Sequence, residues 1–244
     1  MTSALQKAEV IPYRLPLMRP WVAARATLAE RRGALLHLID EDSAEGWGDC
    51  APLPSGGDPR AVIAQLDAWA CRPTSADFQS LPPEARWAIE TAQADLAARR
   101  AGVPLWRFFG GTRGEVEVNA ALGPLDDALP ARLAAAAAAG YRIGKIKVGI
   151  APVDEEIARL EALDSPLLLR LDANRAWGDE DARRFLSAIR ALPVEAVEEP
   201  LAQPTLEKLA ALQAALPFAL ALDESLPRFG LRAVIGARAV RRLV

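Results

Sequence analysis

The sequence predicts an α/β protein, with an incomplete parallel β/α barrel that follows a smaller N-terminal α+β domain. Lys147, Asp172, Glu198 and Asp223 each end a short apolar run, and they are separated by 25, 26 and 25 residues. Each step is about the length of one strand plus one helix. Beyond residue 112, strand-like and helix-like segments alternate, which is typical of a parallel sheet with helices outside it. The earlier part of the chain lacks this repeat.

The N-terminal part has the pattern of a small antiparallel sheet with a helix. Apolar runs predict strands at residues 10–17, 34–39 and 46–50, separated by proline, glycine and turn residues. Apolar residues at helical spacing, behind two prolines and before a glycine, predict a helix at 83–100. We place the boundary near Thr112, which gives domains of residues 1–111 and 112–244.

The second part is expected to consist of βα units. Its predicted strands are residues 115–122, 142–148, 167–172, 196–198, 218–223 and 241–244. Its predicted helices are residues 130–139, 153–163, 179–192, 205–216 and 231–237, with Gly140 as a cap after the first. A closed barrel of this kind has eight strands, so the six predicted here form an incomplete one.

Composition excludes several classes of function. The chain has 29 basic and 32 acidic residues, and the basic ones are dispersed, so we expect no nucleic-acid partner. The start of the chain lacks a secretion signal, and apolar runs are too short for a membrane span. Cys50 and Cys71 do not have metal-binding spacing and are expected to be reduced thiols. We therefore expect a cytoplasmic protein without a membrane partner; the oligomeric state is not predicted.

Strand ends carry the residues that suggest chemistry. Because side chains two residues apart on a strand share a face, Lys145 lies with Lys147, and Arg170 lies with Asp172 and Asn174. Acidic groups that point into a closed interior need a cation. Three carboxylates with open positions suit Mg²⁺ better than Zn²⁺, which prefers nitrogen and sulfur. The predicted ligands are Asp172, Glu198 and Asp223.

The two lysines suggest a proton-transfer role. A like charge beside an amine lowers its pKa, so Lys147 is a candidate base with Lys145 beside it. A lysine base opposite a divalent cation is suited to removing a proton next to a carboxylate, because the cation neutralises the negative charge that develops. We therefore expect a small-molecule carboxylate substrate.

Together these motifs resemble a known family. Those that carry the likeness are Lys145-Ile-Lys147, Asp172-Ala-Asn174, Glu198-Glu-Pro200, Asp223-Glu-Ser225, Ala88-Ile-Glu90 and Gly110-Gly111. In this order they resemble the muconate-lactonizing branch of the enolase superfamily, over nearly the whole chain. Residues 169–177 and 46–54 most resemble the o-succinylbenzoate synthases of menaquinone biosynthesis.

The resemblance implies a barrel of the enolase type behind a capping domain, and a Mg²⁺-dependent lyase. Such enzymes dehydrate 2-succinyl-6-hydroxy-2,4-cyclohexadiene-1-carboxylate to 2-succinylbenzoate. Asp172, Glu198 and Asp223 would bind the metal, Lys147 would be the acid/base and Lys145 would assist it. The resemblance also implies Arg170 and Asn174 around the metal and the substrate carboxylate, with Glu224 behind the ligands, and mobile loops at residues 16–26 and 52–58.

The resemblance also implies a second catalytic lysine just after Val244, followed by two more strands. We therefore expect the sequence to be part of a longer chain; alone, it would bind metal weakly and dehydrate its substrate poorly. Alternatives within the family are a dipeptide epimerase, an N-acylamino acid racemase and a muconate cycloisomerase. Outside it, Lys147 could form a Schiff base, or the chain could be a truncated, non-catalytic binding protein.

Overall fold

The computed structural model describes residues 5–23, 26–53, 58–73 and 78–244. It divides into two compact units, one of Met1–Pro20 and Leu28–Val116, the other of Trp21–Thr27 and Glu117–Val244. The main division falls a few residues beyond the boundary predicted near Thr112. Sequence reasoning did not foresee that the short segment Trp21–Thr27 would group with the second unit. Domain bounds of 1–111 and 112–244 stay a prediction.

The first unit contains most of a three-stranded sheet, in the order β1 (Leu5–Ala23), β2 (Ala26–Asp40) and β3 (Glu45–Cys50). Strands β2 and β3 are antiparallel. All three predicted strands exist, but β1 and β2 are much longer than predicted. Residues 16–23, which we expected in a loop, belong to β1, so this expectation was wrong for them, and residues 24–25 lie outside the described part. Most of the other expected loop, residues 52–58, also lies outside it.

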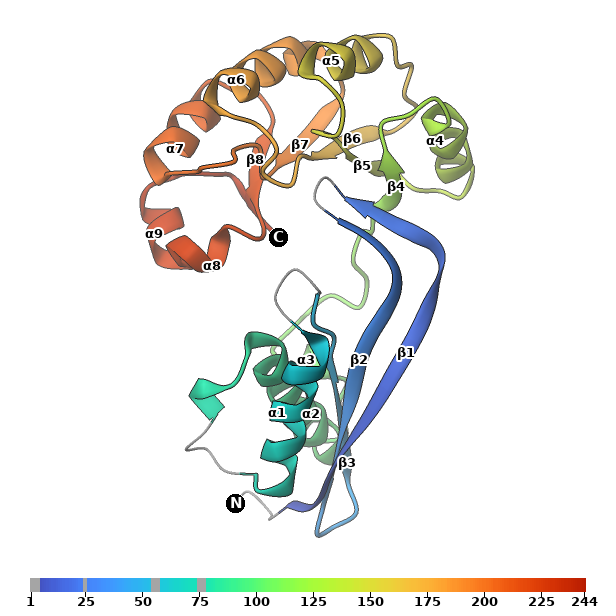
Figure 1. Cartoon of the computed structure of the whole chain (residues 1–244), viewed down its shortest axis with the longest axis vertical. Helices are drawn as coiled ribbons and strands as arrows, with labels where there is room; N and C mark the ends of the chain where they lie inside the picture. The colour runs from blue at the N-terminus through green and yellow to red at the C-terminus, as the bar shows by residue number, and fades with distance from the viewer. Residues whose placement is uncertain (1–4, 24–25, 54–57, 74–77) are drawn as a thin grey trace. The chain divides into compact units, whose positions relative to one another are not determined.

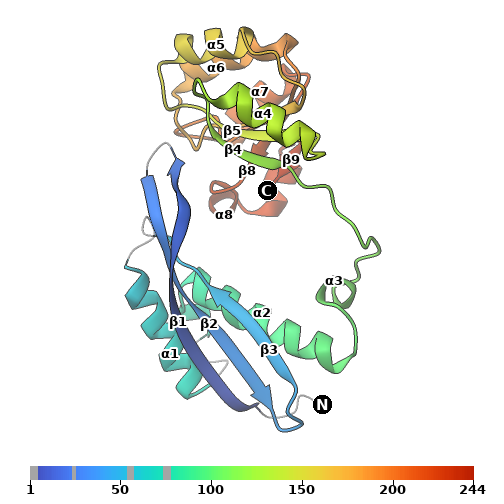
Figure 2. The same ribbon diagram turned by 90° about the vertical axis from the view of Figure 1, so that its right-hand side faces the viewer.

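Two helices, α1 (Pro59–Cys71) and α2 (Pro83–Arg100), cover one face of this sheet (Figure 2). Leu36 and Leu38 of β2 form the core with apolar residues of both helices. Helix α2 matches its prediction. Helix α1 was missed, although Asp58 accepts a hydrogen bond from the Arg60 N–H at its start and proline follows the cap, both ordinary start signals. A short helix, α3 (Leu105–Phe108), and a 3₁₀ turn, η2 (Phe78–Ser80), complete the unit.

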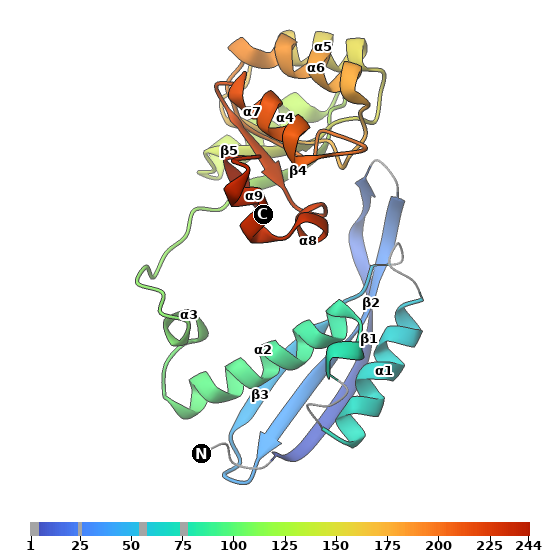
Figure 3. The ribbon, with the colours of Figure 1, turned by 90° about the vertical axis from the view of Figure 1, so that its left-hand side faces the viewer.

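Two glycines let α2 pack closely on β3, as Figure 3 shows. A Cβ atom on Gly46 would lie 2.2 Å from the Ala92 carbonyl oxygen, and one on Gly48 would lie 1.9 Å from the Ala88 oxygen. These distances are far below van der Waals contact. Gly46 and Gly48 are two residues apart on one face of the strand, and Ala88 and Ala92 are one turn apart on the helix. The glycines therefore fix how near the helix comes to the sheet.

The second unit is built on a parallel sheet whose order follows the chain. Its strands are β4 (Ala120–Pro124), β5 (Ile143–Lys147), β6 (Leu168–Asp172), β7 (Val194–Glu198), β8 (Ala219–Leu222) and β9 (Arg242–Leu243). All six were predicted, with ends that differ by up to five residues. Residues 115–119, predicted as the start of the first strand, are not part of it.

The helices of this unit lie outside the sheet (Figure 1). They are α4 (Leu129–Ala138), α5 (Val153–Glu161), α6 (Asp179–Ala188), α7 (Leu206–Ala214), α8 (Leu226–Phe229) and α9 (Leu231–Gly236), with a 3₁₀ turn η3 (Ile189–Ala191) after α6. Of these, α8 was not predicted. Gly140, at φ 88°, directly follows Ala139, the C-cap residue of α4, in the left-handed conformation common at that position.

Successive side chains along each strand point to opposite faces of the sheet, one toward the hydrophobic core and the other toward the candidate site. Ile146, Leu171, Val197 and Leu220 are register partners on four neighbouring strands, and all are buried in the cluster beneath the helices. The residues on either side of them therefore project from the opposite face of the sheet. The charged site residues that lie on strands belong to that face, and they are Lys145, Lys147, Arg170, Asp172 and Glu198. Asp223 and Glu224 follow the end of β8.

Among the helices of the described residues, none is both long and apolar enough to cross a bilayer.

Candidate active site at the strand ends

Three charged residues form a row across the C-terminal ends of β5, β6 and β7. Lys147 is the register partner of Asp172, which is in turn the partner of Glu198. All three side chains are buried, with residue exposures of 8%, 1% and 1%. Equal strand-to-strand steps in the sequence therefore correspond to neighbouring positions in space, as predicted.

Lys145 and Lys147 contact the acids of this row from the same face. The Lys147 Nζ donates to Asp172 Oδ2 and to Asn174 Oδ1, each at 2.6 Å. The Lys145 Nζ lies 2.8 Å from both carboxylate oxygens of Glu198 and 2.9 Å from Asp172 Oδ2. The predicted sharing of a face by Lys145 and Lys147 is confirmed. Asp172 is the point at which the two ammonium groups meet.

A turn after β6 holds the Asp172 carboxylate in place. Its Oδ1 accepts a hydrogen bond from the Asn174 N–H at 3.1 Å, which is the Asx-turn arrangement. Asn174 has φ 45°, in the left-handed region that asparagine tolerates better than most residues. From this position its side-chain oxygen reaches Lys147. Asn174 therefore orients both an acid and an amine of the cluster.

Electrostatics distinguishes the two carboxylates. Burial acts to raise the pKa of Asp172, but hydrogen bonds from Lys147 and Lys145 outweigh it, and the pKa is lowered. Burial raises the pKa of Glu198, where one lysine does not offset the charges of Asp172 and Asp223. Burial also acts against the charge of Lys145, yet its hydrogen bonds to Glu198 and Asp172 leave its pKa raised. The lowered amine pKa expected from a lysine pair is therefore wrong for Lys145.

Asp223 and Glu224 follow β8 and are both exposed. The Asp223 charge acts on the pKa of Glu198, so the third predicted acid belongs to the same electrostatic cluster. Although Glu224 is exposed as a residue, partial desolvation of its carboxyl group is the first cause that raises its pKa, and the charges of nearby acids, Glu199, Asp172 and Asp223, add to it. Negative charge thus accumulates at the ends of β6, β7 and β8.

This set of donors suits a cation. Carboxylate oxygens are the ligands that Mg²⁺ prefers. As the side chains stand, no group of three His, Cys, Asp or Glu residues in the described ranges could hold one ion. Instead, the Lys145 ammonium lies between Asp172 and Glu198 and contacts both. These two carboxylates therefore already share one positive charge, while the ligand set that includes Asp223 stays a prediction.

Arg170 lies one layer below the acids, where it is the register partner of Lys145. Its Nε is 3.0 Å from Glu195 Oε2, and its Nη1 is 3.1 Å from Asn119 Oδ1. Glu195 is near the N-terminal end of β7, and Asn119 directly precedes β4. A role for Arg170 at a metal or a substrate carboxylate stays a prediction.

Sequence reasoning missed two buried acids that hold loops at these strand ends. Glu156 accepts hydrogen bonds from the N–H groups of Gly149, Ile150 and Ala151 after β5. Glu199 accepts hydrogen bonds from the segment after β8. Glu199 could have been noticed, because strand parity places the two neighbouring glutamates of Glu198-Glu-Pro200 on opposite sides of the chain, so each needs its own partners.

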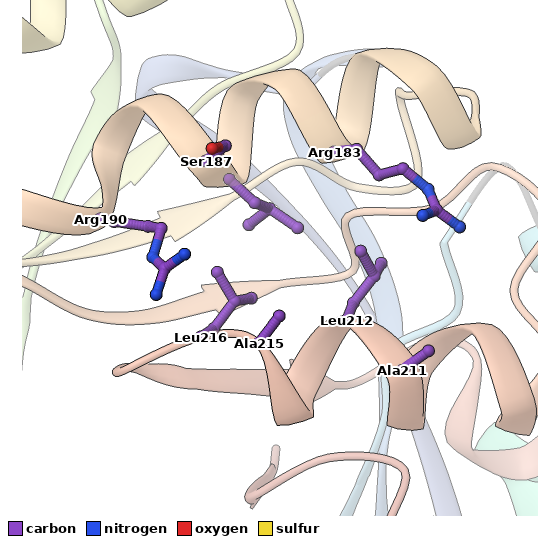
Figure 4. A pocket seen from close by; sticks show the side chains of 8 residues that line it. Arg183, Ser187, Arg190, Ala211, Leu212, Ala215 and Leu216 are labelled. Atoms are coloured by element: carbon purple, nitrogen blue, oxygen red, sulfur yellow. The ribbon is translucent and has the colours of Figure 1, made fainter.

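A cavity elsewhere in this unit is separate from the acids. It has a volume of about 250 Å³ and lies between α6 and α7, with Leu212 and Leu216 in its wall and Arg183 and Arg190 at its sides (Figure 4). Its lining comes from the helical layer and not from the charged face of the sheet. The cavity is therefore separate from the strand-end cluster, which is the candidate active site.

Comparisons with known proteins place the chain among enzymes. The profile of the family described as enolase C-terminal domain-like matches residues 128–243. The chain is 34% identical to the hydrophobic dipeptide epimerase of Enterococcus faecalis, over 91% of this chain and 68% of that protein. It is 30% identical to the o-succinylbenzoate synthase of Thermosynechococcus vestitus, over 95% of this chain and 70% of that protein. Identity therefore does not favour the synthases over the epimerases.

Solved structures confirm the fold class. The dipeptide epimerase from Enterococcus faecalis, complexed with Mg and the dipeptide L-Leu-L-Tyr, matches with a TM-score of 0.85 at 22% identity, over 98% of this chain and 73% of that one. Identity this low supports the fold alone. The chain spans 60–70% of the length of the curated relatives it matches.

Proposed function

Because this chain belongs to the enolase superfamily, we propose that it is a Mg²⁺-dependent enzyme that removes a proton next to a carboxylate of a small molecule. One observation carries the proposal: Lys147, Asp172 and Glu198 form a buried row of register partners at the strand ends. This row combines an amine that can transfer a proton with acids that can hold a cation. Parallel β/α barrels carry their chemistry at the same ends of their strands.

Lys147 is the proposed acid/base. Its amine is oriented by Asp172 and Asn174, and it is the more buried of the two lysines, with 10% of its side chain exposed against 23% for Lys145. A neutral Lys147 would take the proton from the carbon next to the substrate carboxylate. Lys145, as the second ammonium of the cluster, would assist by holding negative charge.

Asp172, Glu198 and Asp223 are the proposed Mg²⁺ ligands. Asp172 and Glu198 already contact one ammonium group together, and the Asp223 charge acts on Glu198. Mg²⁺, when bound, would supply positive charge near the substrate carboxylate, where negative charge develops as the proton leaves.

The specific reaction we propose is that of an o-succinylbenzoate synthase in menaquinone biosynthesis, in the cytoplasm. In that reaction, 2-succinyl-6-hydroxy-2,4-cyclohexadiene-1-carboxylate loses the proton on the carbon that bears the ring carboxylate. The ring hydroxyl leaves with a proton as water, and the ring becomes aromatic. The motifs at residues 169–177 and 46–54 and the relative at 30% identity support this proposal.

Dipeptide epimerisation is the second candidate. The relative at 34% identity is a hydrophobic dipeptide epimerase, and its name supports a dipeptide substrate. Epimerisation would begin with the same loss of a proton next to a carboxylate or carbonyl group. It would end by return of a proton to the opposite face and not by loss of water.

Both reactions are tested by incubating the protein and Mg²⁺ with each substrate in D₂O. A synthase would form 2-succinylbenzoate, which ultraviolet absorbance detects through its aromatic ring. An epimerase would incorporate deuterium at Cα of a dipeptide such as L-Leu-L-Tyr, which mass spectrometry detects. We expect Lys147→Ala to lower the active reaction by about 10²–10⁴-fold, and Lys208→Ala, at an exposed ion pair in the same unit, to leave it unchanged. Equal rates for the wild type and Lys147→Ala would overturn the proposal.

A further inference from the structure

Glu199 is a buried acid to which the proposed chemistry assigns no task. It directly follows β7, has φ 46° and is 1% exposed. A carboxylate removed from water in this way is costly unless hydrogen bonds replace the lost solvent. The left-handed backbone conformation adds strain at a residue other than glycine. Both features call for a compensating role.

The carboxylate of Glu199 binds the segment after β8. Its Oε1 accepts hydrogen bonds from the N–H of Asp223 at 2.9 Å and from the N–H of Ser225 at 2.7 Å. Its Oε2 accepts a hydrogen bond from the Ser225 hydroxyl at 2.7 Å. Ser225 is itself buried, with 2% exposure. All three donors thus belong to the turn that carries Asp223.

The main chain of Glu199 joins the neighbouring strands as well. Its N–H donates to the Ala221 oxygen at 3.0 Å, and its carbonyl accepts from the Arg175 N–H at 2.7 Å. Glu199 therefore connects the turns after β6 and β8 with the end of β7. Within this arrangement, the residue before it, Glu198, points to the opposite side, toward Lys145.

The Asp223 side chain is exposed, and among the described residues it makes no hydrogen bond or ion pair of its own. Its position therefore depends on the backbone of its turn, to which Glu199 is hydrogen-bonded at the N–H groups of Asp223 and Ser225. We propose that Glu199 is a positioning residue that holds the Asp223 carboxylate beside Glu198, so that the two can share one divalent cation. This inference rests on the proposed function.

Substitutions at position 199 separate a positioning role from a merely stabilising one. In Glu199→Gln, the amide oxygen can still accept both N–H groups, and the amide NH₂ can donate to the Ser225 hydroxyl, which also accepts. Glu199→Ala removes all three hydrogen bonds. Glu156→Ala is the matched control, because Glu156 is equally buried and also accepts three hydrogen bonds, all from backbone N–H groups of the segment after β5.

The experiment measures Mn²⁺ binding to the full chain by electron paramagnetic resonance, with Mn²⁺ as a probe for Mg²⁺. Circular dichroism and thermal unfolding of each variant show the temperature range in which it is folded, and binding is compared within that range. We expect Glu199→Ala to bind Mn²⁺ at least tenfold more weakly, and Glu199→Gln to stay within threefold of the wild type. Glu156→Ala should lose stability but keep its Mn²⁺ affinity.

If Glu199→Ala does not fold, Ser225→Ala replaces it, since that variant loses one of the three hydrogen bonds; we then expect a twofold to fivefold weaker affinity. Equal Mn²⁺ affinity in the wild type and the folded Glu199→Ala or Ser225→Ala variant would overturn the positioning role alone. An equal loss of affinity in Glu156→Ala would overturn it too, because the effect would then follow stability. If the wild type itself does not bind Mn²⁺, the proposed function fails, and this inference fails with it.

Discussion

Lys147 and Asp172 are register partners on neighbouring parallel strands, and their side chains form a buried ion pair with an Nζ to Oδ2 distance of 2.6 Å. The pair lies 25 residues apart in sequence, one βα step. Lys145 contacts the same carboxylate oxygen at 2.9 Å. Asp172 therefore faces two ammonium groups, and this surplus of positive charge is the cause that lowers its pKa despite burial.

We expect Lys147→Met to destabilise the protein by about 3 kcal/mol, the low end for breaking a buried pair, because Lys145 still contacts Asp172. The matched control is Lys208→Met. Lys208 pairs with Asp179 at the same 2.6 Å, but both side chains are more than a third exposed. We expect that control to cost about 0–1 kcal/mol. Urea unfolding followed by circular dichroism measures both, and equal losses would contradict the prediction.

Sequence alone locates much of this site, for physical reasons. The constant step between strand ends and the two-residue parity of strands place Lys147, Asp172 and Glu198 in one row, because both are properties of regular parallel structure. The pKa of Lys145 could not be predicted in the same way. Its partners come from strands 27 and 53 residues later, and the balance between burial and their charges depends on distances.

Two other features could not be predicted from the local sequence pattern: the length of β1 and the partners of Glu199. The extension of β1 through residues 16–23 runs through Pro16 and Pro20, which argue against a strand unless it is at the edge of a sheet. Strand β1 is indeed at an edge, in the order β1-β2-β3. The role of Glu199 depends on a turn 24 residues away, so sequence spacing indicates that it needs partners without naming them.

The glycines of β3 give a second prediction. We expect Gly48→Ala to destabilise the protein by about 2–3 kcal/mol, as overpacking does when a backbone atom must move. The added Cβ would lie 1.9 Å from the Ala88 carbonyl oxygen, and a helix backbone cannot turn aside as a flexible side chain can. Gly114→Ala is the control, because a Cβ there meets no atom within 4 Å. Thermal unfolding measures both variants, and an equal loss of stability in Gly48→Ala and Gly114→Ala would contradict the prediction.

The two cysteines should differ sharply in reactivity. Cys50 is fully buried, and burial, with the charges of Glu84 and Asp49, raises the pKa of its thiol to about 11. Cys71 is exposed. Because the thiolate is the reactive form, we expect a disulfide reagent at pH 8 to modify Cys71 within seconds and Cys50 only as the protein unfolds. Cys71→Ser should abolish the fast phase of the absorbance change. A fast phase that survives in this variant would show that Cys50 is accessible.

Tyr13 should make stability depend on pH in the alkaline range. Burial and a hydrogen bond donated to Asp49 Oδ1 at 2.8 Å raise the pKa of Tyr13 to about 12, from an ordinary value near 10. The folded state therefore holds this proton more tightly than the unfolded chain does. The resulting stabilisation is complete below pH 10 and is lost as the pH rises through 12.

Tyr13→Phe removes that proton, so we expect the free energy of unfolding to fall less steeply between pH 10 and pH 12 in this variant than in the wild type. Lysines titrate in the same range, but they are common to both proteins and cancel in the difference. Tyr141→Phe serves a second measurement: it leaves Tyr13 as the one remaining tyrosine, whose absorbance near 295 nm should then titrate with a midpoint near 12. A midpoint near 10 would show that the hydrogen bond to Asp49 does not hold the phenol proton.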